Sequence, residues 1–480
     1  MVGINITLLS PSLTRIAIDL GNLDGRQWIV TSYMITYLTI LPISGKLSDI
    51  FGRRLLLILA TILFAFCPIG AALATNFATL VVARGLQGLG GGVCLTVPAI
   101  VMDDIAPIEK KALFQSMLSL VIGISNLVGP IIGGVFTDQV SWRWAFWLNV
   151  VLGTISLLMV VFFVQETVVI QEASALQKLK RIDWLGIMVN FGFVSSLLLF
   201  LQWGPDDSWS SPRVIATAIG TGLGLLILIA VESLFAKDPV IPVVVFNRSS
   251  SFFFAFSFAS NLIAGPVLYY MSILFESVYG ASGLETAIRL LPSTGAVIIG
   301  SVATHFLFRI FKHTKLVLAV DATLHMVAYG LVQTLTPTSS WAQQAFYFMP
   351  AFFGVPLERT ATIIGARATC SNDLAATAIS LVTFTSAMGF TLGLPIFELV
   401  HKVTLAKEID SMNDTVKEQA KRIMGNAGAA YFAIHRMPSQ VQEAIIHAYM
   451  NSMRQVFLFP LIVGGVMLVL ALFMKNVRCS

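Results

Sequence analysis

Charged residues are scarce in this 480-residue sequence. Only 11% of its residues are Asp, Glu, Lys or Arg, whereas 56% are hydrophobic, and the mean hydropathy is +0.83. Soluble domains carry about 25% charged residues, so this chain cannot cover a water-soluble globule of its size. Apolar runs at residues 55–74, 144–164 and 456–473 approach or reach the ~20 residues that cross a bilayer as a helix. We therefore expect an all-α polytopic membrane protein with the lipid bilayer as its main solvent.

Several reactive patterns are also missing. The four cysteines have no paired spacing, and the six histidines form no metal-ligand spacing, which argues against a disulfide framework or a metal site. No Gly-Lys-Ser/Thr phosphate loop occurs. We therefore expect no metal, no cofactor and no enzymatic activity. The net charge of +5 comes from basic residues in short loops, and a positive-inside bias explains it better than binding to nucleic acid.

Apolar runs separated by polar breaks predict fourteen membrane spans. An even number of spans puts both termini on one side of the membrane. The predicted spans are residues 2–18, 28–45, 55–74, 78–101, 113–136, 144–164, 184–203, 213–235, 252–276, 286–307, 315–335, 342–364, 376–400 and 455–474.

The basic residues orient these spans. Fifteen of them fall in loops of the presumed inner side, and four lie in or near outer loops, so the positive-inside rule places both termini in the cytoplasm. By parity the long connection 401–454 is outside. It holds Asn413-Asp414-Thr415, the glycosylation acceptor pattern that lies on the outer side.

The decapeptide GKLSDIFGRR lies between the second and third predicted spans, at residues 45–54. Glycines let two helices approach closely, an aspartate can cap a helix terminus, and arginines can bridge to neighbouring helix ends. The whole string resembles the inner-loop signature of the major facilitator superfamily. That resemblance implies stabilisation of one closed state of a transporter by Gly45, Asp49, Gly52, Arg53 and Arg54.

The fourth predicted span contains RGLQGLGGG at residues 84–92. A charge inside a membrane helix costs at least ~2.5 kcal/mol on insertion scales, so Arg84 is a candidate functional residue. The glycines suit tight helix packing. The string resembles the fourth-helix motif of the same superfamily, whose arginine is associated with proton coupling, and this implies that Arg84 and Gln87 lie near a coupling site.

The fifth predicted span carries Gly123 and the string GPIIGG at residues 129–134. This spacing resembles the glycine-proline motif of exporters in the superfamily and favours export over import. Physically, it makes a kinked, closely packed helix pair that can act as a pivot. The residues concerned are Gly123, Gly129, Pro130, Gly133 and Gly134.

Two further strings narrow the group: SWRWAFWLN at residues 141–149 and IDWLG at residues 182–186. They are similar to strings of the fourteen-span drug:proton antiporters, especially fungal toxin and multidrug efflux pumps, and the resemblance covers nearly the whole chain. It implies the major facilitator fold, with two six-helix bundles and two inserted helices. The implied divisions are an N-terminal bundle at 1–164, the inserted helices at 165–250 and a C-terminal bundle at 251–480 that includes the long loop 401–454.

An internal repeat should relate the two bundles. The string FRIFKH at residues 308–313 lies where a second inner loop belongs and echoes SDIFGR at residues 48–53. Arg309 replaces the aspartate of the first copy, so the repeat is weak.

The first predicted helix departs from the family. Aligning AIDLG at residues 17–21 with the usual helix ending puts Asn5 where the group has an aspartate. Asparagine hydrogen-bonds but exchanges no proton in the useful pH range, so the expected carboxylate partner of Arg84 is missing. We also expect the first half of this helix to be absent because the sequence starts at an internal methionine. A shortened, impaired member is the alternative.

Asp321 is then the best carboxylate for carrying protons. It lies about two turns into the eleventh predicted span, and His325 shares its helix face four residues later. A pairing of Asp321 with Lys315, or exposure to a watery vestibule, is the structural alternative. Tyr33, Asn126 and Gln333 are candidates for lining a central cavity.

These observations favour a proton-coupled antiporter that exports small lipophilic organic compounds by alternating access, driven by the proton gradient. Its partners would be a small-molecule substrate, protons and the bilayer, and we expect it to act as a monomer. Family habit favours the plasma membrane, with the vacuolar membrane as the alternative. A proton-coupled importer, for example of iron chelates, and a non-transporting relative stay open as other functions.

Overall fold

The computed structural model shows a helical membrane protein, and the residues it describes contain no β-strand. The described residues are 1–9, 12–22, 25–107, 110–166, 175–206, 210–235, 239–413, 417–418, 434 and 437–477. In this part of the chain, eleven helices are long and apolar enough to cross a membrane. The predicted all-α polytopic class is thereby confirmed.

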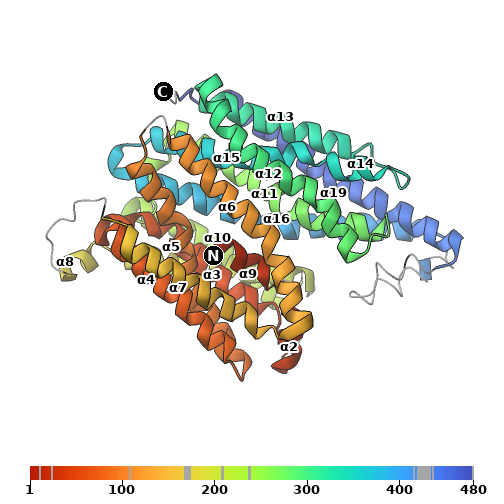
Figure 1. Ribbon diagram of the computed structural model, residues 1–480, viewed down its shortest axis with the longest axis horizontal. Coiled ribbons are helices and arrows are strands. Elements are labelled where there is room, and N and C mark those ends of the chain that lie inside the picture. The colour runs from red at the N-terminus through yellow and green to blue at the C-terminus, as the bar shows by residue number, and fades with distance from the viewer. Residues whose placement is uncertain are drawn as a thin grey trace. The chain divides into compact units, whose positions relative to one another are not determined.

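Figure 1 shows the helices in the order in which they follow one another along the chain. Those of the first half are α1 (Val2–Leu8), α2 (Leu13–Asp19), α3 (Trp28–Phe51), α4 (Arg53–Ala72), α5 (Phe77–Ile105), α6 (Lys111–Val135), α7 (Arg143–Phe163), α8 (Ala175–Lys180), α9 (Trp184–Asp206) and α10 (Pro212–Ala230). Those of the second half are α11 (Arg248–Ser277), α12 (Gly283–Phe311), α13 (Thr314–Val332), α14 (Trp341–Phe346), α15 (Met349–Ala368), α16 (Ala375–Asp410) and α19 (Ser439–Phe473).

The eleven long apolar helices account for eleven of the fourteen predicted spans, and the other three correspond to α1 with α2, to α6, and to α14 with α15. Residues 2–18 form the two short helices α1 and α2, and the sequence carries Pro11 between them, a residue that disfavours helix just before it. Residues 113–136 lie largely in α6, which has 25 residues. Residues 342–364 are divided between α14 and α15, and α15 is less apolar because it holds Glu358, Arg359 and Arg367.

Two helices extend well beyond their predicted spans, into the segment predicted as a long loop. The helix α16 continues to Asp410, and α19 begins at Ser439. Each is about 50 Å long at 1.5 Å per residue, so both exceed the ~30 Å hydrocarbon core of a bilayer. The connection between them therefore begins after residue 410 and ends before residue 439.

Local sequence explains several helix ends. Asn76 caps α5 by accepting a hydrogen bond from the backbone N–H of Thr79 at 2.8 Å. Ser282 and Glu285 form a reciprocal capping box at the start of α12. Such caps satisfy backbone donors that would otherwise be unpaired at the first turn.

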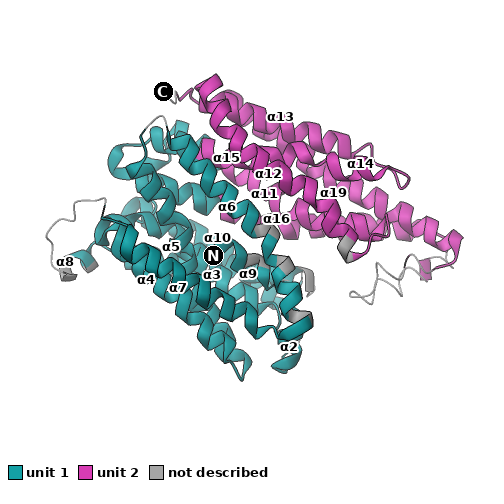
Figure 2. Ribbon diagram, in the orientation of Figure 1, with its two compact units in different colours: residues 1–254, 363–385, 480 teal, residues 255–362, 386–479 magenta. Residues whose placement is uncertain are grey.

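The chain contacts divide the molecule into two compact units (Figure 2). Unit 1 takes in residues 1–254 and 363–385, and unit 2 takes in residues 255–362 and 386–479. Within unit 2, α13 and α19 pack side by side (Figure 1). In unit 1, a buried apolar cluster joins residues of α1, α4 and α5 with Trp142 and Phe146 of the 141–149 string. The division predicted from family resemblance stays a prediction.

Candidate functional site

The inner-loop motif is organised around Arg53, whose side chain is only 6% exposed. The guanidinium forms an ion pair with Asp49 one turn earlier, and its Nε lies 3.2 Å from Asp104 Oδ2 at the end of α5. Nη1 also donates to Ser48 Oγ at 2.8 Å. The motif therefore ties the end of α3, the start of α4 and the end of α5 into one network.

Arg54 differs from its neighbour because it is exposed. Its Nη2 donates to the carbonyl oxygen of Val161 at 2.7 Å. The carboxylate of Glu166 accepts from the backbone N–H of Arg53 at 2.9 Å and of Arg54 at 3.3 Å, which suits an acid at a helix N-terminus. Glu166 therefore joins the motif to the end of α7, and the sequence analysis had not singled it out.

A second charged cluster sits beside the motif on Asp103. Its carboxylate lies 2.7 Å from Lys111 Nζ and 3.0 Å from Arg367 Nε. Gly45 allows α3 to approach α16 closely, because a Cβ at this position would lie 2.5 Å from the carbonyl oxygen of Ala376. Residues 363–385 are thus held against α3 and α5 within unit 1 by two charges and one glycine.

Arg84 is 2% exposed and lies two turns into α5. Its Nη1 donates to Gln87 Oε1 at 2.6 Å and to Asn5 Oδ1 at 3.1 Å, and its Nε donates to the carbonyl oxygen of Ile29 at 3.1 Å. Gln87 Nε2 also donates to Asn5 Oδ1, at 3.2 Å. The guanidinium lies over the ring of Tyr33, 4.4 Å from its centroid. The structure therefore brings together Arg84, Gln87, Asn5 and Tyr33.

The predicted antiporter motif lies on α6. Gly133 faces the backbone of Leu8, so that a Cβ would collide with the carbonyl oxygen of Leu8, whereas Gly134 has open space around it. The close approach of α1 and α6 thus depends on Gly133. Gly123 and Gly129 also lie on this helix, and the side chain of Pro130 lies outside the described atoms.

Asp321 and His325 are fully buried in unit 2, one turn apart on α13. His325 Nδ1 lies 3.0 Å from the carbonyl oxygen of Asp321 and 3.3 Å from its carboxylate Oδ1. Because a carbonyl oxygen only accepts, Nδ1 carries the hydrogen. Within the described chain, neither carboxylate oxygen of Asp321 nor His325 Nε2 has a hydrogen-bond partner. Lys315 bonds the carbonyl oxygen of Leu472 instead, so the alternative pairing with Asp321 is not observed.

Glu358 is a third buried ionisable residue here, 3% exposed, and the sequence analysis missed it. It lies one turn after Gly354 on α15, and a Cβ at Gly354 would collide with Asp321 Oδ1 and lie 3.2 Å from His325 Cε1. Glu358 is close enough to interact electrostatically with Asp321, His325 and the neighbouring Arg359. The signal for it was present, because an acid inside the predicted span 342–364 is itself a candidate functional residue.

Neutral polar groups complete the surroundings of Glu358. Thr362 Oγ1 donates to Glu358 Oε1 at 3.2 Å, and Asn261 Nδ2 of α11 lies 3.4 Å from Oε2.

His325 is also packed against α19, where Gly464 faces Met326 and the Cβ of His325. Asp321, His325 and Glu358 are called the acid cluster below.

The three predicted cavity residues have separate environments. Tyr33 is buried beneath Arg84 and stacks on Tyr37 with ring centroids 5.6 Å apart. Gln333 caps the end of α13 and donates to the carbonyl oxygen of Arg454 at 3.1 Å. The side chain of Asn126 lies outside the described atoms. That these three residues line one cavity therefore stays a prediction.

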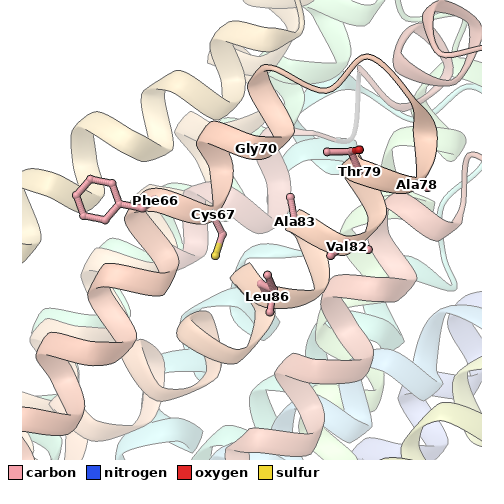
Figure 3. A pocket seen from close by; sticks show the side chains of 8 residues that line it. All are labelled: Phe66, Cys67, Gly70, Ala78, Thr79, Val82, Ala83 and Leu86. Atoms are coloured by element: carbon pink, nitrogen blue, oxygen red, sulfur yellow. The ribbon is translucent and has the colours of Figure 1, made fainter.

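An apolar groove of about 520 Å³ lies between α4 and α5 in unit 1 (Figure 3). Phe66, Val82 and Leu86 in its lining are exposed. The lining holds no ionisable group except Cys67 and does not include Arg84. The lining residues are Phe66, Cys67, Gly70, Ala78, Thr79, Val82, Ala83 and Leu86.

Comparison with known proteins supplies an independent view of the chain. The family model of the Major Facilitator Superfamily matches residues 1–394. A transporter of the acurin A biosynthesis cluster of Aspergillus aculeatus is 28% identical over 490 residues, covering 100% of this chain and 87% of that protein. Multidrug resistance protein 3 of Bacillus subtilis is 26% identical over 488 residues, covering 100% and 93%.

A solved structure gives the same fold. The proton:xylose symporter XylE, bound to 6-bromo-6-deoxy-D-glucose, superposes with a TM-score of 0.64 at 13% sequence identity. The match covers 100% of this chain and 94% of that one. At this low identity the likeness concerns the fold, and the predicted fold is confirmed.

Proposed function

This chain belongs to the Major Facilitator Superfamily, and from that membership we propose that it is a proton-coupled exporter of small lipophilic organic compounds. Fungal secondary metabolites, toxins and drugs are the substrate class. The names of two relatives support this class, because one belongs to a metabolite biosynthesis cluster and the other to multidrug resistance. The GPIIGG string on α6 supports the outward direction.

The acid cluster is the observation that carries proton coupling. Asp321 lies fully buried with His325 Nδ1 3.3 Å from its Oδ1. Among the described residues, neither of its carboxylate oxygens nor His325 Nε2 has a hydrogen-bond partner. An ionised carboxylate without donors is costly in the membrane interior, and a bound proton removes that cost. The carboxylate of Asp321 and Nε2 of His325 are therefore available to accept a proton, and His325 Nδ1 is the charged or polar neighbour of that carboxylate at 3.3 Å.

The charge change explains how a proton would drive movement. With Asp321 protonated, the cluster tolerates a closed and dry environment. With Asp321 ionised, a conformation that lets water reach α13 and α15 gains stability. A protein whose two conformations differ in proton affinity shifts its population when the proton binds or leaves, and a gradient then drives alternating access around the substrate site.

The inner-loop network fits a gating role in this scheme. Arg53 ties three helices together through Asp49 and Asp104, and Arg367 attaches residues 363–385 to Asp103. These ion pairs would form in one conformation and break in another. We propose that the chain acts as a monomer in the plasma membrane with both termini in the cytoplasm, and that it needs no cofactor.

The test is uptake into inverted membrane vesicles that carry the full chain. A lipophilic dye and a fungal metabolite are offered under an imposed pH gradient, with wild type beside Asp321→Asn. The matched control is Glu276→Gln, the same chemical change in a partly exposed acid at the end of α11. We expect gradient-driven uptake by wild type and Glu276→Gln, abolished by a protonophore and by Asp321→Asn.

Other outcomes separate the alternative functions. Accumulation in intact cells that exceeds that of empty cells and needs the gradient would support an importer instead. A correctly inserted chain that moves no probe in either direction would support a non-transporting relative. Uptake that persists in Asp321→Asn would support export but contradict the assignment of the proton site to the acid cluster.

A further inference from the structure

Arg84 carries a buried positive charge with neutral partners. Its guanidinium bonds the side-chain oxygens of Asn5 and Gln87 and the backbone oxygen of Ile29, and it lies over the ring of Tyr33. None of the ion pairs among the described residues includes Arg84. A full charge that is 98% buried in a membrane helix therefore has no counter-ion within the described chain.

Such a charge is energetically unusual. A buried ion is tolerated when an opposite charge and further hydrogen bonds compensate for its lost hydration. Amide oxygens supply only part of this compensation, since they accept hydrogen bonds from the guanidinium but bring no opposite charge. The site therefore favours an anion that would replace or join the amide oxygens of Asn5 and Gln87.

Unused donors point to the same chemistry. Among the described residues, the hydrogen bonds of Arg84 use Nε and Nη1, and none uses Nη2. Asn5 is fully buried, its Oδ1 accepts from both Arg84 and Gln87, and its Nδ2 has no hydrogen-bond partner in the described part of the chain. A buried donor without a partner is destabilising, and a ligand that brings acceptor oxygens would satisfy it.

We propose that Arg84, Asn5 and Gln87 bind the carboxylate of an organic acid, so that the exported compounds include lipophilic acids. The planar guanidinium fork matches a carboxylate with two parallel hydrogen bonds, and Asn5 Nδ2 offers a third donor. This inference rests on the proposed transport function for its substrate but concerns a binding site in unit 1, apart from the acid cluster of unit 2.

The test compares benzoate with benzamide, which match in shape and differ in charge. The probe is added to the purified full chain in detergent at constant ionic strength, and the midpoint of thermal unfolding is measured. We expect benzoate at ten times its half-saturating concentration to raise the midpoint by about 1–2 °C, and benzamide to leave it unchanged. Equal effects of the two probes, including no effect of either, would overturn the proposal.

Two variants supply an internal carboxylate next to Arg84. Asn5→Asp and Gln87→Glu each place an acid where an amide oxygen already accepts from Nη1. Each should raise the midpoint without ligand and remove the benzoate response. Gln442→Glu adds the same charge to α19 in unit 2 and should keep the response. If one of these two acid variants fails to fold, the benzoate response is measured in the other. A benzoate response that persists in the folded variant contradicts the proposal.

The same experiment distinguishes an exported acid from a membrane fatty acid as the ligand, and it tests binding independently of transport. Oleate raising the midpoint where benzoate does not would assign the site to a membrane fatty acid and overturn the substrate assignment. Binding in detergent needs no gradient. A benzoate response in a chain that transports nothing would therefore support the carboxylate site and contradict the proposed export function. Transport without a benzoate response would support export and contradict the carboxylate site.

Discussion

Gly52 and Lys312 adopt positive φ angles at the same place in two turns that each join a pair of long helices. Gly52, with φ of 92°, is the single residue between α3 and α4, and Lys312, with φ of 55°, ends α12 just before α13. In the alignment of SDIFGR with FRIFKH these two residues coincide. The weak sequence echo therefore corresponds to a shared backbone feature in the two halves of the chain.

The two positions predict opposite responses to substitution. At Gly52 the angles φ 92° and ψ 149° belong to a region that is nearly restricted to glycine, so Gly52→Ala should destabilise by about 1–3 kcal/mol. At Lys312 the left-handed angles suit glycine better than lysine, so Lys312→Gly should keep or raise stability. Thermal unfolding of both variants in detergent checks this, and a Gly52→Ala variant as stable as wild type would contradict it.

The two adjacent arginines of the inner loop should differ in their effects on stability. Arg53→Ala leaves Asp49 and Asp104 without their partner. Because these two side chains are 34% and 27% exposed, the loss should be about 1–3 kcal/mol, less than for a fully buried ion pair. Arg54 is exposed, so Arg54→Ala should cost less than about 1 kcal/mol. Unfolding midpoints of the two variants measure the difference. Equal midpoints would mean that the network around Arg53 contributes little.

Neutralising Asp321 should reduce gradient-driven accumulation of substrate but not substrate exchange. Asp321→Asn keeps the shape of the side chain but no longer exchanges a proton, so gradient-driven uptake should fall at least tenfold. Exchange of labelled for unlabelled substrate, which needs no net proton movement, should persist. Glu358→Gln should show the same pattern more weakly, because Glu358 already has Thr362 and Asn261 as partners. Loss of both activities in a well-folded Asp321→Asn variant would indicate a structural role.

Gly354 should tolerate no side chain. A methyl group there would collide with Asp321 Oδ1, so Gly354→Ala should destabilise by about 1–3 kcal/mol through overpacking and reduce gradient-driven transport. Gly330→Ala is the matched control, since nothing lies within 4 Å of a Cβ at that position in the neighbouring α13. It should be neutral or slightly stabilising in a helix. Similar unfolding midpoints for the two alanine variants would refute the close packing at Gly354.

Glycosylation of Asn413 tests the predicted orientation. Asn413 is exposed, whereas Asp414 and Thr415 of its acceptor pattern lie outside the described residues. If the connection after α16 faces the outside, expression in a eukaryotic host should give a glycan that an endoglycosidase removes. The resulting shift on a gel should be absent from Asn413→Gln. An unmodified wild-type chain would leave the orientation to cysteine labelling from each side.

Much of the helical architecture was predictable because a long apolar run has few alternatives in lipid. The departures have physical reasons. Residues 2–18 form two helices with Pro11 between them in the sequence. In α15, Arg367 pairs with Asp103, and Glu358 is buried with hydrogen bonds to neutral side chains. The extra turns of α16 and α19 are polar, so the predicted spans, which were defined by hydropathy, did not contain them. A helix can continue beyond the bilayer into water.

The candidate site was predictable only in part. Asp321 and His325 were recognisable because their spacing of four residues fixes a shared helix face. Glu358 escaped because its relation to them depends on the packing of α15 on α13, which a single sequence does not encode locally. Arg84 and Gln87 were singled out from one string, and the alignment put Asn5 at the position of the expected partner of Arg84. The hydrogen bonds of Asn5 to both residues agree with that alignment.

Because Gly354 has no side chain, its evolution should be coupled to that of Asp321. Position 354 and position 321 share one small volume, so neither can enlarge without a change in the other. A lineage that acquires alanine or serine at 354 must shorten or lose the acid at 321, and with it the buried charge. Among related genes, these two positions should therefore vary together, and a bulky residue at 354 should mark descendants that have abandoned this acid.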